Sequence, residues 1–119
     1  MKTNELVGAA LDWAVAEAEG FFKNDMARIT DGKVDVFYFD GYAPSIDWQQ
    51  GGAIIEREGI NLDNYAKNPQ WSAWTPAPER ATGEAQAYGK TPLVAAMRCY
   101  VASKLGDDVE VPTELTQGE

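Results

Sequence analysis

Residues 45–58 hold the densest collection of side chains able to do chemistry: carboxylates, an arginine, a tryptophan and two adjacent glycines. Asp47, Glu56 and Glu58 supply the carboxylates, and a pair of such groups is able to transfer protons or to hold a hard cation. Their spacing does not match a calcium-binding loop, and Glu56 and Glu58, two residues apart, do not share a face of a helix. The spacing therefore favours solvated surface carboxylates over a catalytic pair.

The two glycines, Gly51 and Gly52, indicate that something approaches the backbone closely, because glycine has no Cβ atom. In one interpretation, the N–H groups that enter the segment 53–58 bind a phosphate or carboxylate, with Arg57 one turn further on. In the other, the glycines belong to a tight loop that packs under a neighbouring element. The sequence leaves both interpretations open.

Three tryptophans, Trp48, Trp71 and Trp74, offer flat faces on which a base or another ring can stack. Such a contact contributes about 1–3 kcal/mol per base in nucleic-acid complexes. Trp71 and Trp74 fall in a stretch that we expect to be a loop, and loops on a rigid scaffold commonly carry binding sites. Aromatic side chains also anchor loops to the body of a domain, so the pattern alone does not separate the two roles.

Gly89, Lys90 and Thr91 precede a predicted helix in the manner of a phosphate-binding loop. The full motif requires a glycine where this chain has Glu84, so a nucleotide-hydrolysing loop is not predicted. The N–H groups at the start of the helix are still able to bind an anion, although an ordinary capped helix has the same pattern. Arg98, in the same helix, is either a surface charge or a pocket residue.

The candidate site is thus a pocket for a flat anion, built from aromatic rings, arginines and the starts of helices. We predict no catalytic residue, no metal ligand and no cofactor. The candidate ligand-binding residues are Ser45, Asp47, Trp48, Gly51, Gly52, Arg57, Trp71, Trp74, Thr91 and Arg98.

The composition excludes several classes of function. The chain of 119 residues contains no histidine and one cysteine, which removes histidine-based catalysis, the usual zinc sites and an internal disulfide. The formal net charge of −9 makes duplex nucleic acid an unfavourable partner. There is no membrane-spanning apolar run and no signal-peptide pattern, so we expect a cytoplasmic protein without membrane contact that forms one domain over residues 1–119.

Two long helices are predicted. Residues 3–19 place apolar side chains on a broad stripe, with Asp12 and Glu19 outside it. Residues 91–105 have the strongest helix signals: an N-capping threonine, a proline in the first turn and a glycine after the end. Both helices therefore have one face to bury.

The stretch 45–59 allows two structures. Ser45 or Asp47 is able to cap a helix that continues to Gly59. However, each glycine inside a helix costs about 1 kcal/mol relative to alanine. We therefore favour a loop over 45–52 followed by a short helix, AIIERE.

Residues 34–39 form the clearest predicted strand, because apolar side chains occur on both alternating faces, which is typical of a covered or central strand. Phe21 and Phe22 are the candidate partner strand across a hairpin. Short strands are also predicted over 60–62 and 109–111.

The stretch 63–89 is rich in proline and small polar residues, which predicts a long loop, and 113–119 is predicted to be a frayed tail. Together the elements predict an α+β fold. It consists of a small, mainly antiparallel sheet on which two long helices and one short helix pack.

Three blocks of the chain, MKTNELVGAALDWAVAEAEG, YAPSIDWQQGGAIIEREGI and GKTPLVAAMRCYVASKLGDDVEVP, resemble the NinX-like proteins of tailed bacteriophages and their prophages. The blocks cover about half of the chain in the family's order, and Ala53 stands where the family pattern has proline. The resemblance implies a small phage accessory protein made in the infected bacterial cell. It implies no enzymatic role.

Three hypotheses follow for the function. The first is a non-enzymatic protein that binds a small anionic, nucleotide-derived ligand, which in a phage setting suggests sequestration of a signal of bacterial immunity. The second is a modulator that binds a host or phage protein through acidic and aromatic surface residues. The third is a metal-dependent hydrolase of a small phosphoester that uses Asp47 and Glu56. Pairing of two copies of the chain is left open.

Overall fold

The structure, a computed structural model, describes residues 1–64 and 70–116. It contains α-helices, β-strands and two short 3-10 helices, η1 and η2. In chain order they are η1 Thr3–Glu5, α1 Gly8–Ala18, β1 Ala27–Thr30, β2 Lys33–Val36, α2 Trp48–Glu58, β3 Asn61–Asn64, β4 Trp71–Pro76, β5 Glu84–Gly89, α3 Pro92–Leu105 and η2 Thr113–Leu115.

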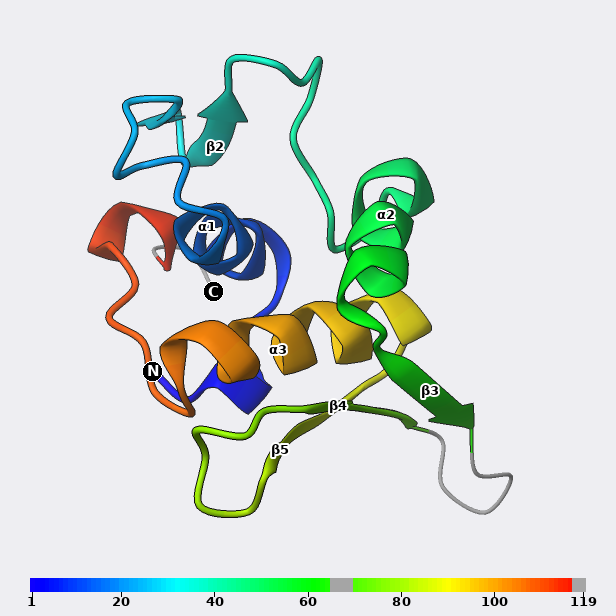
Figure 1. The fold of residues 1–119 in the computed structure, drawn as a ribbon. Coiled ribbons are helices and arrows are strands. Elements are labelled where there is room, and N and C mark those ends of the chain that lie inside the picture. Colours follow the sequence, from blue (N-terminus) through cyan, green and yellow to red (C-terminus); the bar gives the residue numbers. More distant parts are fainter. Residues whose placement is uncertain (65–69, 117–119) are drawn as a thin grey trace.

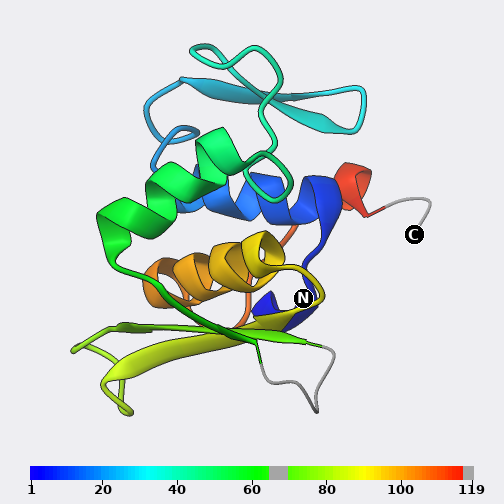
Figure 2. The same ribbon diagram turned by 90° about the vertical axis from the view of Figure 1, so that its right-hand side faces the viewer.

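The elements stack in layers on either side of α3 (Figure 1). The sheet β3–β4–β5 covers one side of α3, and α1 and α2 cover the other. The β1–β2 hairpin packs on α1, so the layers in Figure 2 run from the hairpin at the top to the three-stranded sheet at the bottom. The predicted α+β class with antiparallel strands is confirmed, and the strands divide between two sheets.

The three-stranded sheet occupies most of the stretch in which a long loop was predicted. β4 pairs antiparallel with both β3 and β5, which places Trp74 between Asn61 and Gln86. Ala73 and Ala87 are 0% and 1% exposed on the face that packs against α3. The loop prediction for 63–89 is therefore wrong over residues 71–76 and 84–89, because proline is tolerated at the end of a strand and Pro76 occupies that position. The loop prediction is also wrong at residues 63–64, which belong to β3, whereas residues 70 and 77–83 lie in no strand or helix, as predicted, and residues 65–69 lie outside the described residues.

The β1–β2 hairpin differs from the predicted strand at both ends. β2 ends at Val36, and residues 37–39 turn away with exposed aromatic side chains. Its partner is β1 rather than Phe21 and Phe22, because the positive φ angles of Asp31 and Gly32 make a tight two-residue turn. The alternation of apolar residues continues to residue 39, so the sequence did not indicate that pairing of β2 with β1 ends at Val36.

α1 begins at Gly8, later than the predicted helix, since Leu6 and Val7 are extended between η1 and α1. Asp12, predicted to lie outside the buried stripe, is 8% exposed. The hairpin and residues 41–46 cover this side of α1, so a face that the sequence assigned to solvent is buried.

α2 is longer than predicted and contains both glycines. Asp47 caps it by accepting a hydrogen bond from the Gln49 N–H at 2.8 Å. A Cβ atom on Gly51 would collide with the carbonyl oxygen of Pro44 and would lie 2.6 Å from Cδ2 of Leu93. The close approach at Gly51 is therefore packing of the helix against its neighbours, and the predicted loop over 45–52 is wrong from Trp48 onward.

α3 matches its prediction at both ends. The Thr91 hydroxyl accepts a hydrogen bond from the Val94 N–H at 3.1 Å, and Gly106 follows the last turn with a φ of 90°. Cys99 lies in this helix with 0% exposure, and burial raises the pKa of its thiol to about 12. The thiol is therefore a packed core group.

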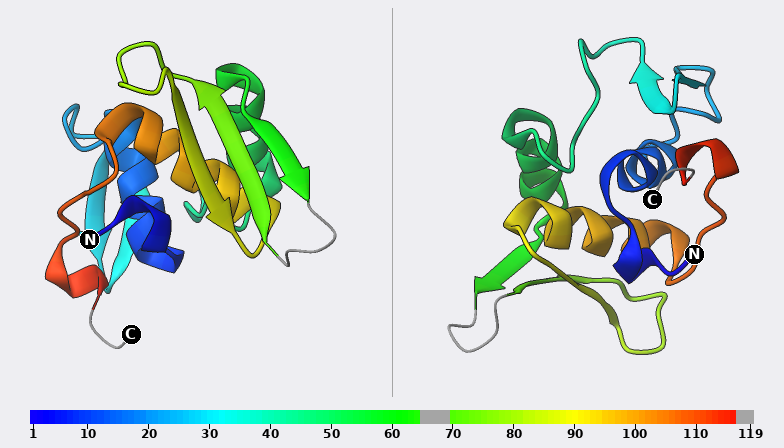
Figure 3. Two further views of the ribbon diagram at one scale, coloured as in Figure 1. Left: turned by 90° about the horizontal axis from the view of Figure 1, so that it is seen from below. Right: turned by 180° about the vertical axis from the view of Figure 1, so that it is seen from behind.

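The N-terminal segment lies beside the segment that follows α3, as the view from behind in Figure 3 shows. The Thr3 N–H donates to the carbonyl of Asp107 at 2.8 Å, and the Thr3 hydroxyl donates to the carbonyl of Gly106 at 2.7 Å. The predicted strand over 109–111 is wrong, because the contact here is a single bridge between Lys2 and Asp108. η2 buries Leu115 in the predicted tail, and residues 117–119 lie outside the described residues.

Candidate functional site

Residues 41–50 connect the hairpin to α2 and line three hollows in the surface. Gln50 holds this segment in a compact turn, because its side chain accepts a hydrogen bond from the Ala43 N–H and donates one to the Gly41 carbonyl, both at 2.8 Å. Asp47 also donates its N–H to the carbonyl of Ala43 at 2.9 Å. The segment is therefore a fixed wall that separates α1 from the start of α2.

The first hollow, here called the Asp12 pocket, has a volume of about 400 Å³ and lies between α1, β2 and residues 41–46. Asp12 lines the pocket, and the Asp12 Oδ1 accepts a hydrogen bond from the Ser45 N–H at 2.9 Å. Burial raises the pKa of Asp12 to about 6, and hydrogen bonds from Ser45 counteract part of that effect. The lining residues are Gly8, Ala9, Asp12, Lys33, Val34, Asp35, Gly41, Tyr42, Ala43, Ser45 and Ile46.

Tyr42 lines the Asp12 pocket and the neighbouring hollow as well. Its ring makes edge contacts with Phe21 and Phe39, at centroid distances of 6.0 and 5.1 Å. The residue is 8% exposed, and its hydroxyl is buried without a hydrogen-bond partner among residues 1–64 and 70–116. Burial raises the pKa of Tyr42, and the carboxylates of Glu19 and Asp12 raise it further. A buried polar group without a partner is uncommon and marks a place where water or a ligand atom belongs.

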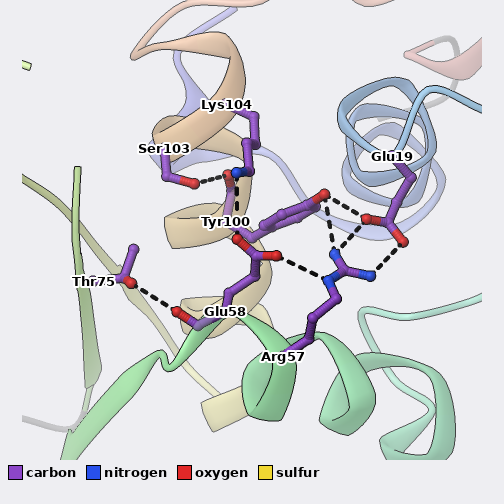
Figure 4. Close-up of polar contacts among 7 residues, drawn as sticks. All are labelled: Glu19, Arg57, Glu58, Thr75, Tyr100, Ser103 and Lys104. Carbon is purple, nitrogen blue, oxygen red and sulfur yellow. Dashed lines mark hydrogen bonds and ion pairs between the residues drawn. The ribbon is translucent and has the colours of Figure 1, made fainter. Parts of the chain in front are cut away.

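The second hollow, about 160 Å³ in volume, borders a polar network that joins the three α-helices (Figure 4). Arg57 of α2 contacts Glu19, just after α1, at 2.5 Å and Glu58 at 2.8 Å. The Tyr100 hydroxyl of α3 donates to Glu19, and Lys104 lies 3.4 Å from Glu58. Burial raises the pKa of Glu58, but its contacts with Arg57 and Lys104 outweigh that effect and lower the pKa.

Arg57 is therefore occupied by partners within the chain. Its pKa is raised, first by the hydrogen bond to Glu19, and its guanidinium lies 5.6 Å from the centroid of the Tyr100 ring. The Asp47 carboxylate caps the start of α2. Its negative charge repels an anion from this helix N-terminus, which was one of the predicted anion sites. These two residues position α2 and do not form a free anion site.

The third hollow, about 180 Å³ in volume, brings together part of the predicted set. Ser45, Trp48 and Thr91 line it, with Trp48 55% exposed beside the start of α3. Gly51 is packed into the interior behind this hollow, and a Cβ on Gly52 would lie 3.6 Å from the Trp48 ring, an ordinary contact. The structure thus places Ser45, Trp48 and Thr91 of the predicted set around one hollow.

The remaining candidates lie elsewhere. Trp71 is partly buried against the main core, and Trp74 is 37% exposed on the outer face of the sheet, which Figure 3 shows from below. Arg98 donates to the carbonyls of Leu6 and Tyr88 at 2.8 and 2.7 Å, and burial lowers its pKa. Trp71 and Arg98 anchor a strand and a helix, Trp74 lies on the surface, and none of the three lines the hollows around residues 41–50.

Residues 1–64 and 70–116 contain neither a metal-binding cluster nor a membrane-spanning helix. No group of three or more aspartate, glutamate or cysteine side chains in them is placed to hold a metal ion. None of the helices in those ranges has the length and apolar character needed to cross a bilayer.

A family model described as Bacteriophage P22, NinX matches residues 2–104. The chain belongs to this family. The match covers the Asp12 pocket, the polar network around Arg57 and the hollow beside Trp48. Comparison with curated proteins found no match. Membership in the NinX family shows a phage accessory protein and confirms the resemblance inferred from the three sequence blocks.

Asp12, Tyr42 and Lys33 line the largest of the three hollows around residues 41–50, and the sequence did not identify them as site residues. A single aspartate on a helix has no distinguishing pattern, because solvated carboxylates have the same appearance in a sequence. Tyr42 gave a weak signal, since it lies three residues before the stretch 45–58 in which the sequence places many of the candidate residues.

Proposed function

We propose that this NinX family member is a non-enzymatic protein that binds a host or phage protein in the cytoplasm of the infected cell. The observation that carries the proposal is the position of its exposed apolar side chains. Eight large hydrophobic side chains are exposed among the described residues, and five of them lie within residues 37–48. They are Phe37, Tyr38, Phe39, Ile46 and Trp48, here called the 37–48 surface.

Concentration of exposed aromatic residues on one segment is typical of a protein contact, because isolated surface hydrophobics are common but grouped ones are not. Tyr38 and Ile46 are 78% and 77% exposed, so their side chains contribute little to the core. The acidic charge of the chain also favours a partner with a basic surface.

Three of the four arginines are engaged within the chain, which supports a protein partner over a small anion. Arg57 binds Glu19 and Glu58, and Arg98 binds two backbone carbonyls. Arg80 binds Asp107 at 2.9 Å and the carbonyl of Ala102 at 2.9 Å. An anionic ligand would have to displace these partners, whereas a protein contact over the 37–48 surface would not.

The test is quantitative binding with matched surface variants. A tagged chain is produced during phage infection, and a protein recovered in a fixed ratio is purified and titrated by calorimetry. We expect Tyr38→Ser and Ile46→Ser each to weaken binding by about tenfold or more, as at interface hot spots. Trp74→Ser, on the outer face of the sheet, is the matched control and should leave the affinity unchanged. Equal affinity in all three variants would place the contact elsewhere.

A second candidate function is binding of a small, flat, nucleotide-derived anion, including a signal of bacterial immunity. One observation favours it: Ser45, Trp48 and Thr91 line the same hollow. Mass spectrometry of nucleotides released from protein purified from infected cells tests it. A bound nucleotide that disappears in Trp48→Ala would support this candidate, and protein free of nucleotide would argue against it.

A further inference from the structure

Asp12 carries a carboxylate in a nearly closed environment without a cationic partner. It is 8% exposed, and no lysine or arginine of the described residues forms an ion pair with it. Its polar contacts come from Ser45, whose N–H donates to Oδ1 at 2.9 Å. A buried charge of this kind is costly unless it is paired, so a positive group brought to Asp12 would gain free energy that a solvated carboxylate does not offer.

The groups around Asp12 leave room for such a partner. Lys33 and Asp35 of β2 stand on the pocket wall with opposite charges, so they offset one another. Tyr42 also lines the pocket, and its aromatic ring is suited to contact with a basic side chain. The remaining lining is mostly apolar and suits the methylene stem of a long basic side chain.

The pocket is continuous with the 37–48 surface, because Ile46 belongs to both. A partner seated on that surface therefore brings its own side chains to the pocket mouth. The formal net charge of −9 also draws basic groups toward the molecule.

We propose that the Asp12 pocket receives a lysine or arginine side chain of the protein partner, which pairs with the Asp12 carboxylate. This inference rests on the proposed function, since it assigns a chemistry to the partner's contact. A basic anchor in a desolvated pocket beside an aromatic surface is the arrangement found at interface hot spots.

The first test needs no partner. The isolated chain is titrated with n-butylguanidinium and n-butylammonium, which mimic arginine and lysine side chains, and amide shifts are followed by NMR at constant ionic strength. Saturable shifts are expected at Ala9, Tyr42 and Ser45. Neutral n-butylurea should bind at least about tenfold more weakly, because charge assists the hydrogen bonds of the cation.

Two further measurements test whether Asp12 is the group that binds the cationic probe. Asp12→Asn should abolish saturation, while Asp63→Asn, an exposed carboxylate on the three-stranded sheet, should bind as the wild type does. In the wild type, the carboxyl carbon shift of Asp12 should report a lower pKa with the cation bound, which requires no folded variant. An unchanged titration of Asp12, or equal binding of n-butylurea, overturns the proposal.

Binding of the protein partner shows whether the cation in the pocket is a side chain of that partner or a free amine. If Asp12→Asn weakens the partner's binding by about tenfold or more, the basic group belongs to the partner. If the probes bind but Asp12→Asn leaves that affinity unchanged, the pocket takes a free amine and the proposal is wrong. A negative probe titration overturns only this inference, since the Tyr38 and Ile46 variants test the proposed function separately.

Discussion

A carboxylate that loses its water on folding is destabilised in its charged form, and Asp12 is in that position. The hydrogen bond from Ser45 replaces part of the stabilisation that water gives to a carboxylate. No cation of the described residues forms an ion pair with Asp12 to replace the remainder. A group that lowers stability persists where binding needs it, as at many functional sites. At the scale of the residue, the charge of Asp12 affects both stability and binding. A measurement of stability therefore tests the same unpaired charge that the binding experiments test.

The pH dependence of stability has a definite sign. The pKa of Asp12 rises from 3.8 to about 6 on folding, so between these values the folded state holds a proton that the unfolded state has lost. The contribution of Asp12 to the free energy of unfolding should therefore fall as pH rises from 4 to 6, by up to about 3 kcal/mol, whereas Glu58, whose pKa is lowered on folding, contributes in the opposite direction. Asp12→Asn should remove this fall and be the more stable protein at pH 7.5.

Urea denaturation of both proteins between pH 4 and 8 measures this difference. Asp63→Asn, an exposed carboxylate on β3, is the control and should retain the wild-type slope. Parallel curves for wild type and Asp12→Asn would show that Asp12 does not carry an unpaired charge in the folded state.

At the scale of the element, α2 contains two adjacent glycines with opposite roles. A Cβ on Gly51 meets the Pro44 backbone and Leu93, whereas one on Gly52 makes only an ordinary contact with Trp48. We expect Gly51→Ala to destabilise the fold by about 1–3 kcal/mol through overpacking. Gly52→Ala should instead stabilise it by up to about 1 kcal/mol, because alanine is the better helix former.

Thermal or urea unfolding followed by circular dichroism compares the two variants, each serving as the control for the other. Equal effects of the same sign would mean that helix propensity alone governs both positions. In that case the contact of α2 with Pro44 and Leu93 would not be the reason for the glycine.

The elements that could be predicted are those with local signals. α3 was predicted almost residue for residue, because its threonine cap, first-turn proline and final glycine are adjacent to the helix that they delimit. β4 and β5 were missed, because their evidence is their pairing with each other, which no short window contains. The same lack of information about pairing explains the wrong prediction at residues 37–39. Their alternation continues past Val36, which is the last paired residue of β2.

The candidate site stays a prediction, and the structure shows where its residues lie. Several residues of the stretch 45–58 line the hollows, yet the arginine and the first glycine in this stretch serve to hold α2 in place. The buried carboxylate was missed, because Asp12 is covered by β2 and residues 41–46, which are distant in sequence. Burial of a polar residue depends on the whole molecule, and a helical pattern does not contain that information.

At the scale of the whole molecule, the net charge of −9 acts over the full extent of the fold. The dimensions are 38 × 29 × 26 Å, and the Debye length is about 30 Å at an ionic strength of about 0.01 M but about 8 Å at about 0.15 M. Like charges therefore repel across the entire chain at low salt and only between neighbours at higher salt. The ion pairs of Arg57 and Arg80 are weakened by salt, but partly exposed pairs contribute little.

We therefore expect sodium chloride between about 0.01 and 0.15 M to raise the midpoint of thermal unfolding at pH 7.5, because screening of the net charge outweighs the loss of ion pairs. The matched control is the same salt series at pH 4.4, near the isoelectric point of about 4.4, where the net repulsion is absent and the rise should vanish. Differential scanning calorimetry measures both series. A midpoint that falls with salt at pH 7.5 would show that the ion pairs linking the helices, above all Arg57 with Glu19, outweigh the repulsion among the acidic residues.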